Sequence, residues 1–221
     1  MDAKESLIQS LLRDGYLKTP RIVEAFRAID RADFVRPEYA GEAYGNYPLP
    51  IGEGQTISQP LTVAFMLELL QPEAGDVILD VGAGSGWTTA LLAHIVGSEG
   101  KVVGVERIPS LCEFGKENVA KYKFTNAEII CADGALDLSK YGPYDRTLAG
   151  AAAPRLAGGA SPDDIGRAAL DSIPKEWRRE LKVGGRIVAP IGGSVWLFIK
   201  KSESEWDEQE FPGFAFVPLI K

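Results

Sequence analysis

Apolar residues in the first part of the chain recur at the spacing of helices. Such runs extend from Leu7 to Leu12 and again from Ile22 to Ile29, and each places its apolar side chains on one helical face. Thr19 followed by Pro20 favours a helix start, because it offers a capping hydroxyl and then a proline at the first turn. The pattern therefore predicts helices before the main fold begins.

Residues 41–60 have a different pattern. Seven glycines and prolines are spread through this stretch, which predicts a long structured loop rather than a regular element. Loops of this length inside a compact domain are often functional. Residues 61–70 then resume a helical pattern. We therefore divide residues 1–60 into N-terminal helices and a candidate substrate loop.

From Asp76 onward, apolar strands alternate with helices. Such alternation predicts a parallel sheet with helices on both faces, and right-handed crossovers make it doubly wound. We expect a single α/β domain over residues 1–221, a Rossmann-like fold with a mostly parallel sheet. The expected helices are Trp87–Val96, Pro109–Lys121 and 162–182, and the expected strands are Val77–Val81, Lys101–Glu106, Ala127–Cys131, Tyr144–Gly150, Gly185–Pro190, Val195–Lys200 and a last one near Phe214–Leu219.

Composition narrows the classes of protein. The chain has 221 residues and a net charge of −7, which suits one domain and disfavours nucleic acid as a partner. No apolar stretch approaches the roughly 18 residues that span a membrane, and the N-terminus does not resemble a signal peptide. Cys112 and Cys131 are too few for a disulfide framework or a cysteine metal site. We expect them to be small buried residues in a reduced, cytoplasmic protein.

A glycine-rich loop follows the first strand of the alternating region. Asp80 ends that strand, and Gly82, Gly84 and Gly86 follow it closely. Glycines let a ligand approach the backbone, and the helix that follows offers free N–H groups. Glu106 ends the next strand, where a carboxylate can accept hydrogen bonds from the hydroxyls of a ribose. Together these residues predict a nucleoside site.

The details of the loop favour one nucleoside. The third glycine arrives one residue too early for a dinucleotide fingerprint, and no triphosphate loop is present. Asp80 would repel phosphates but would suit an ammonium group, and Asp133-Gly134 follows the third strand, where a carboxylate can accept the adenine amino group. S-adenosylmethionine carries an ammonium, a ribose and an adenine. We therefore expect it as the cofactor, held by Asp80, Gly82, Gly84, Gly86, Glu106, Asp133 and Gly134. The only histidine, His94, lies inside a predicted helix, and we expect no metal site.

The segment Pro48-Leu-Pro-Ile-Gly-Glu-Gly-Gln-Thr-Ile-Ser-Gln-Pro60 resembles the substrate loop of the protein-L-isoaspartate O-methyltransferases. The resemblance extends from about Tyr44 to Leu219. Further similar pieces are Val103–Pro109, Ala132–Gly134, Tyr144–Arg146, Ala151–Pro154, Val183–Arg186 and Phe216–Leu219.

That resemblance implies transfer of a methyl group to the carboxylate of an isoaspartyl residue in a damaged protein, the first step of protein repair. It implies that Thr56, Ile57 and Ser58 line the acceptor site, with Ser58 as the catalytic residue, and that Val217 lies in a terminal strand that contacts the substrate. A carboxylate with an ordinary pKa of about 4 needs no general base. A helix cap before Pro60 remains a second role for Ser58.

Three features depart from the family pattern. Gly150 stands where the family usually has a threonine, which loosens the fourth strand and removes a hydroxyl. Residues 155–173 resemble an insertion, and we expect its helix to lie over or beside the substrate cleft. Ala215 stands where the family often has an arginine. These departures bear on the choice of acceptor.

Two other functions stay open at the level of sequence. One is a related methyltransferase that esterifies normal aspartate and forms an aspartimide. The other is a non-catalytic module that binds S-adenosylmethionine. For the main hypothesis we expect a monomer whose partners are isoaspartyl proteins or peptides, with neither nucleic acid nor membrane involved.

Overall fold

The computed structural model describes residues 2–135, 138–152 and 162–216. Its main sheet has seven strands in the order β5-β4-β3-β6-β7-β8-β9. Strands β5 to β7 are parallel, and β8 and β9 are antiparallel to their neighbours. The predicted mostly parallel α/β sheet is therefore confirmed. The strands are β3 Val77–Val81, β4 Lys101–Glu106, β5 Ala127–Cys131, β6 Tyr144–Ala149, β7 Leu181–Ile191, β8 Ser194–Lys200 and β9 Trp206–Pro212.

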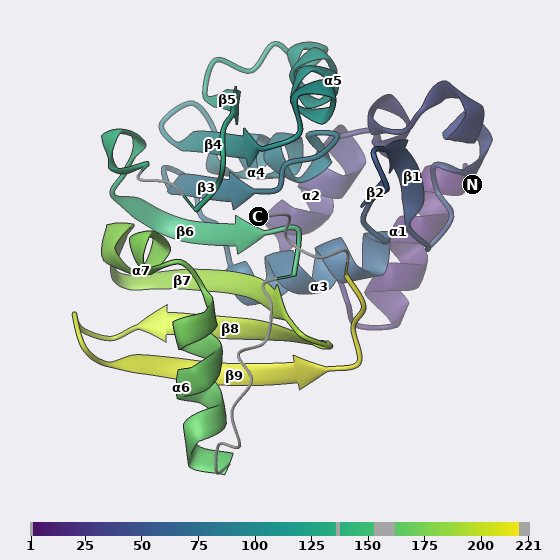
Figure 1. Ribbon diagram of the computed structural model, residues 1–221. Coiled ribbons are helices and arrows are strands. Elements are labelled where there is room, and N and C mark those ends of the chain that lie inside the picture. The colour runs from purple at the N-terminus through teal and green to yellow at the C-terminus, as the bar shows by residue number, and fades with distance from the viewer. Residues whose placement is uncertain (1, 136–137, 153–161, 217–221) are drawn as a thin grey trace.

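Helices cover both faces of this sheet (Figure 1). On one face pack α1 Ala3–Arg13, α2 Pro20–Ala28, α3 Pro60–Leu70, α4 Trp87–Val96 and α5 Pro109–Ala120. On the other face pack α6 Pro162–Ser172 and α7 Lys175–Glu180. The sequence pattern predicted one helix across 162–182, but it breaks at Ile173–Pro174 because proline cannot continue a helix.

The N-terminal helices begin where the sequence predicted, but one cap differs. Thr19 occupies the N-cap of α2, yet its hydroxyl makes no capping hydrogen bond. It donates instead to the carboxylate of Glu68 in α3, at 2.7 Å. Two 3-10 turns, Arg31–Phe34 and Pro37–Glu42, follow α2. The helical extension is thus tied to the main domain by a side-chain contact that no local pattern specifies.

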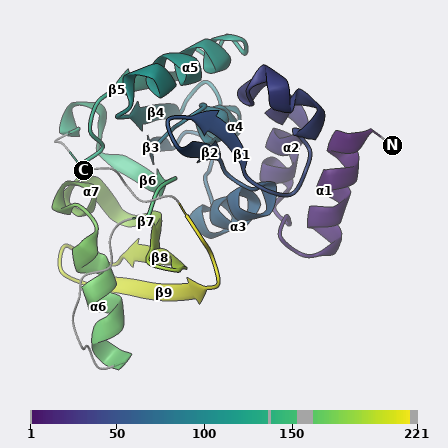
Figure 2. The same ribbon diagram turned by 45° about the vertical axis from the view of Figure 1, so that its right-hand side comes forward.

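The segment predicted as a loop contains a β-hairpin. Strands β1 Leu49–Gly52 and β2 Gln55–Ile57 pair antiparallel, so the expectation of no regular element in 41–60 is wrong. Gly52 and Gly54, which suggested a loop, sit at the turn with positive φ angles that glycine tolerates. The hairpin faces the ends toward which β3, β4 and β6 point (Figure 1), and it lies between α5 and α3 (Figure 2).

The last strand also differs from the prediction. The expected strand near Phe214–Leu219 is not formed over residues 213–216, and residues 217–219 lie outside the described part of the chain. The strand that the sequence pattern missed is β9, an edge strand whose four central residues, 207–210, are all polar. An edge strand with polar residues gives a weak hydrophobic signal.

Helix α6 belongs to the segment that resembles an insertion. It packs on β9, where Gly166 lies so close to Glu208 that an added Cβ would come within 2.7 Å of the carboxylate oxygen. Its Ala169 and Leu170 join the core formed with Trp196 and Phe198. The expectation of a helix beside the substrate cleft is therefore wrong for the described residues of this segment, which begin at Pro162.

Cys112 and Cys131 form a disulfide between α5 and β5. Cys112 is buried and Cys131 is exposed, so the expectation of two unpaired buried cysteines is wrong, and cysteine usage no longer indicates a reduced compartment. The pair was missed because residues far apart in sequence meet when β5 aligns beside β4. In the part of the chain that the structure describes, no helix has the length and apolar character needed to cross a membrane.

Reduction of this disulfide is expected to lower the free energy of unfolding by about 3 kcal/mol, because the bond closes a loop of about 20 residues in the unfolded chain. Denaturant titrations with and without reductant measure the difference. The Cys112→Ser/Cys131→Ser variant serves as the control and should not respond to reductant. Two free thiols in the unfolded, unreduced protein would contradict the bond itself.

Candidate active site

The glycine loop connects β3 to α4 with three glycines at positive φ, which are 75° at Gly82, 53° at Gly84 and 87° at Gly86. Only the first two face the open space above the sheet. Gly86 is packed on α5, where an added Cβ would come within 2.8 Å of Val119. Gly86 thus allows helix and loop to approach closely, and the expected direct cofactor contact has no geometric support.

Glu106, at the end of β4, fixes the shape of the loop. Its Oε2 accepts the N–H of Gly84 and its Oε1 accepts the N–H of Ile108, both at 2.9 Å. The side chain is 93% buried, with 7% of its surface exposed toward the hollow that it lines. Each carboxylate oxygen can accept a further hydrogen bond, so both can still receive hydroxyl donors.

Asp80 lies beneath the glycine loop rather than in it. Its carboxylate is fully buried, and its Oδ2 accepts the hydroxyls of Thr88 at 2.8 Å and Thr89 at 2.6 Å. Oδ1 has no hydrogen-bond partner. Burial raises the pKa of Asp80 to about 6, against the lowering effect of the two threonine hydroxyls. Thr88 lines a hollow beside the glycine loop, whereas Asp80 is not among the lining residues of that hollow.

This raised pKa predicts a pH dependence of cofactor binding. S-adenosylmethionine has a net positive charge at neutral pH, so its affinity should rise as Asp80 ionises between about pH 5 and 7. Ionised Asp80 also destabilises the free protein, because burial disfavours its charge, so stability is lost as pH rises from about 4, the ordinary pKa, through the raised pKa of about 6. In Asp80→Asn the affinity should be lower and flat across this range, as measured by calorimetric titration.

Asp76→Asn is a matched control, because Asp76 precedes β3 at the opposite end of the strand and its pKa is also raised by burial. It should keep the pH dependence of affinity. An equally steep dependence in Asp80→Asn would show that another group titrates.

Asp133 and Gly134 follow β5 on the far side of the hollow. Asp133 accepts the N–H of Ala135 at 2.9 Å, and its carboxylate lies 3.9 Å from Arg107. Gly134 is close to Val81, and an added Cβ would come within 2.4 Å of that side chain. Its carbonyl accepts the indole N–H of Trp177 at 2.7 Å. This glycine is needed for packing as well as for access.

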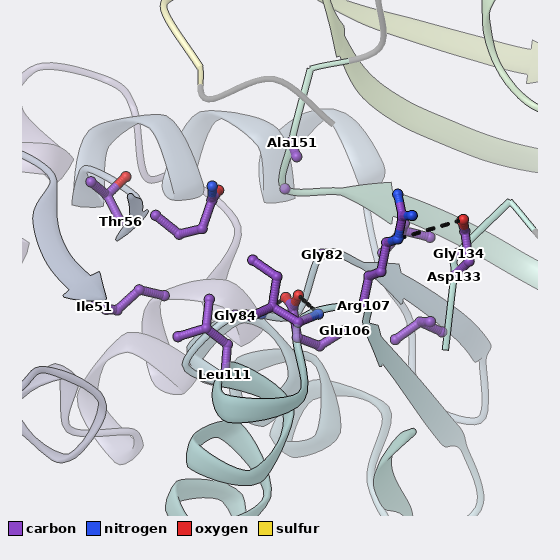
Figure 3. Close-up of a pocket in the computed structure, with 15 residues that line it drawn as sticks. Ile51, Thr56, Gly82, Gly84, Glu106, Arg107, Leu111, Asp133, Gly134 and Ala151 are labelled. Carbon is purple, nitrogen blue, oxygen red and sulfur yellow. Dashed lines mark hydrogen bonds and ion pairs between the residues drawn. The ribbon is translucent and has the colours of Figure 1, made fainter. Parts of the chain in front are cut away.

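These residues surround one hollow, which we call the first hollow. Figure 3 shows it with Ile51 and Thr56 of the hairpin at one end and Asp133 and Gly134 at the other. Ile51 packs over the glycine loop, since an added Cβ at Gly84 would lie 3.2 Å from it. The lining residues are Ile51, Gln55, Thr56, Val81, Gly82, Gly84, Val105, Glu106, Arg107, Ile108, Leu111, Asp133, Gly134, Gly150 and Ala151.

A second hollow is lined by Pro48, Thr56, Ser58, Gln59, Thr62, Gly150, Ala215 and Phe216. No charged side chain is among these lining residues. Thr56 and Gly150 line both hollows. They also line a third, smaller hollow together with Ile57, Ser58 and Trp87, and we call this third hollow the passage.

Ser58 does not cap the following helix. Gln59 occupies the N-cap of α3 without a side-chain bond, and the carboxamide oxygen of Asn46 accepts the N–H of Leu61 in the first turn at 3.0 Å. Within the described residues the Ser58 hydroxyl has no hydrogen-bond partner, so it is available to a ligand. The capping alternative is therefore wrong.

Gly150 follows the end of β6 rather than weakening it. Its N–H donates to the carbonyl of Val81 at 2.8 Å, which continues the pairing of β6 with β3. An added Cβ would lie 2.9 Å from the carbonyl of Gly82. The expectation of a loosened strand is wrong, and the role of Gly150 is to let the strand end approach the glycine loop where the two hollows meet.

The structure thus brings together most of the residues that the sequence singled out. Thr56, Gly82, Gly84, Glu106, Asp133 and Gly134 line the first hollow, and Thr56 and Ser58 line the second. Ile57 lines the passage between them. Val217 lies outside the described residues. Sequence reasoning did not assign Gln55, Arg107, Ile108 and Leu111 to the site, although Arg107 and Ile108 directly follow Glu106 at the end of β4.

The donor set fits S-adenosylmethionine. The backbone at Gly82 and Gly84 is accessible from the first hollow. The carboxylates of Glu106, at the end of β4, and Asp133, after β5, line the same hollow, which therefore extends across the ends of β3, β4 and β5. Together with the doubly wound sheet, this defines a class I methyltransferase that uses S-adenosylmethionine.

Comparison with known proteins identifies the family. The model of the "Protein-L-isoaspartate(D-aspartate) O-methyltransferase (PCMT)" family matches residues 2–158. A protein-L-isoaspartate O-methyltransferase of Methanopyrus kandleri is 37% identical, with 99% of this chain and 91% of that protein covered. One of Aeropyrum pernix is 39% identical, with 99% and 80% covered. The chain belongs to the protein-L-isoaspartate(D-aspartate) O-methyltransferase family.

Solved structures agree on the fold. One is a Plasmodium falciparum protein described as a protein-L-isoaspartate O-methyltransferase, solved in complex with S-adenosyl-L-homocysteine. It has a TM-score of 0.80 at 22% identity, covering 100% of this chain and 99% of that chain. A second solved protein-L-isoaspartate O-methyltransferase has a TM-score of 0.82 at 27% identity, covering 99% of this chain and 66% of that chain.

Proposed function

We propose that this protein transfers the methyl group of S-adenosylmethionine to the carboxylate of isoaspartyl residues in damaged proteins and peptides. The observation that carries the proposal is the second hollow, which shares Thr56 and Gly150 with the first hollow and is lined by neutral hydroxyls and an amide. The family to which the chain belongs, and the names of its relatives, point to the same reaction.

The cofactor would lie in the first hollow. Glu106 would accept the ribose hydroxyls, Asp133 the adenine amino group, and buried Asp80 would favour the ammonium group through its charge. When bound, S-adenosylmethionine supplies an electrophilic methyl group on its sulfonium. Gly82 and Gly84 keep side chains away from the surface on which the cofactor rests.

The residues of the second hollow suit an acceptor that is already a nucleophile. A carboxylate is ionised at neutral pH, so no proton must be removed, and no His, Lys, Asp or Glu side chain lines the hollow among the described residues. Ser58 and Thr56 would donate hydrogen bonds that orient one carboxylate oxygen toward the passage. Neutral donors hold the acceptor without the strong ion pair that would weaken its attack, so catalysis rests on positioning.

Methylation turns the carboxylate into an ester, whose methoxy group can leave where the oxygen of a carboxylate cannot. The neighbouring backbone nitrogen then displaces methanol and closes a succinimide, and hydrolysis of the succinimide returns some normal aspartate. These later steps need no residue of this chain. The proposed contribution of the protein therefore ends with formation of the ester.

The chemical stability of the product tests the reaction. Purified protein is incubated with methyl-labelled S-adenosylmethionine and a peptide that contains one isoaspartyl residue. We expect label that is released as volatile methanol in mild base, because methyl esters hydrolyse and methylated amines do not. Label that survives base, or no label in the peptide, would contradict the proposal.

A further inference from the structure

Arg31 is a buried arginine that binds only backbone carbonyls. It lies in the first 3-10 turn with 2% of its surface exposed. Its Nη1 donates to the carbonyls of Ala43 at 2.6 Å and Gly45 at 3.4 Å. Its Nη2 donates to the carbonyls of Tyr47 and Ser58, each at 3.1 Å. One guanidinium thus joins both flanks of the β1-β2 hairpin.

The charge of Arg31 has no carboxylate partner among the described residues. Burial lowers its pKa to about 10, so the guanidinium is still charged at neutral pH. The carbonyl dipoles compensate the charge in part, and the guanidinium carbon also lies 5.3 Å from the ring centre of Trp87. A buried charge without a counter-ion is costly, and an apolar side chain would avoid that cost. The contacts that Arg31 makes are therefore the feature to explain.

Arg31 contacts a residue that lines the second hollow, although it does not line the hollow itself. The carbonyl of Ser58 accepts a hydrogen bond from Arg31, Ser58 also lines the second hollow, and Trp87 lines the passage. Pro48, next to Tyr47, also lines the hollow. The planar, five-donor guanidinium can hold several carbonyls at fixed angles, which a lysine cannot. The backbone of Ser58 is thus held by a side chain that is not among those that line the hollow.

We propose that Arg31 is a positioning residue for the acceptor: it holds the hairpin flanks so that the Ser58 hydroxyl is aimed at the acceptor carboxylate. It does not touch the acceptor itself. The proposal rests on the proposed function, in which the second hollow receives that carboxylate. In this proposal Arg31 acts on the acceptor side of the site, whereas Glu106 and its neighbours act on the cofactor side.

The substitution Arg31→Lys keeps the positive charge but removes the planar guanidinium and its several N–H donors. We expect the KM for an isoaspartyl peptide to rise about tenfold or more, since small displacements of positioning groups have large kinetic effects. Affinity for S-adenosylmethionine should change by less than about threefold. Arg186→Lys is the matched control, because Arg186 also donates to a backbone carbonyl, that of Leu69 at 2.8 Å, but far from the hollows. Its peptide KM should stay unchanged.

Hydrogen exchange of the folded proteins gives a readout that does not use the peptide. In Arg31→Lys, backbone amides of residues 43–58 should exchange faster, while those of β3, β4 and β5 keep their protection. An unchanged KM in folded Arg31→Lys, unchanged exchange in 43–58, or equal losses in peptide KM and cofactor affinity would each overturn the role of Arg31. A wild-type protein that does not methylate the peptide would instead overturn the proposed function.

Discussion

Glu106→Gln is expected to weaken the binding of S-adenosylmethionine by about a hundredfold, although it changes only one atom. Both oxygens of Glu106 accept backbone N–H groups, from Gly84 and Ile108. A carboxamide offers one oxygen and one NH₂ group, so one of these N–H donors would face another donor. Hydrogen bonds to charged groups contribute about 1.5–3 kcal/mol each, and the ribose would lose such a bond as well.

Calorimetric titration with S-adenosylmethionine and with its demethylated product measures this loss. Glu128→Gln is the matched control, because Glu128 lies on neighbouring β5 in an exposed ion pair with Lys101 and should leave the affinity unchanged. The fold of Glu106→Gln is checked by thermal unfolding. Affinity within about threefold of wild type would remove Glu106 from the cofactor site.

Ser58→Ala is expected to lower kcat/KM for an isoaspartyl peptide by about a hundredfold, the scale of losing a well-placed orienting group. The substitution removes only the hydroxyl, because the carbonyl of residue 58 can still accept from Arg31. Affinity for S-adenosylmethionine should therefore stay near that of wild type. Steady-state kinetics with labelled cofactor measure the effect.

The control for this change is Ser98→Ala, an exposed serine after α4, which should keep full activity. Ser58→Thr restores a hydroxyl and is expected to recover part of the lost kcat/KM. Full activity in Ser58→Ala would assign the orienting donor to another group, and Thr56 is the next residue to test because it lines both hollows.

The cofactor side of the site could be predicted from local patterns. Apolar runs define β3, β4 and β5, and parallel strands bring their carboxyl ends to one edge. Gly82, Glu106 and Asp133 each sit just after or at such an end, so their meeting follows from the topology. The position of Ser58 came instead from a resemblance in the hairpin segment, and the second hollow supports it.

What the sequence could not predict depends on contacts between distant segments. From the sequence alone Arg31 would be expected to be an exposed surface residue. Only the folded chain brings carbonyls of residues 43–58 within hydrogen-bond distance of it. The disulfide between Cys112 and Cys131 requires α5 to lie on β5. Strand β9 is polar and lies at an edge, so its hydrophobic pattern is weak. Helix α6 shows a clear helical pattern, but nothing local says that it packs on β9.

Two features of the acceptor side bear on substrate choice. Gly150 and Ala215 both line the second hollow, and at both positions the family pattern suggests a larger residue. A roomier hollow could admit a normal aspartyl residue, as an aspartimide-forming methyltransferase would require. We nevertheless propose isoaspartate as the acceptor.

Methyl transfer to a matched pair of short peptides, identical except that one carries isoaspartate and the other aspartate, tests this claim most directly. We expect base-labile methylation of the isoaspartyl peptide and none above background for the aspartyl peptide. Equal methylation of both peptides, or of the aspartyl peptide alone, would contradict it.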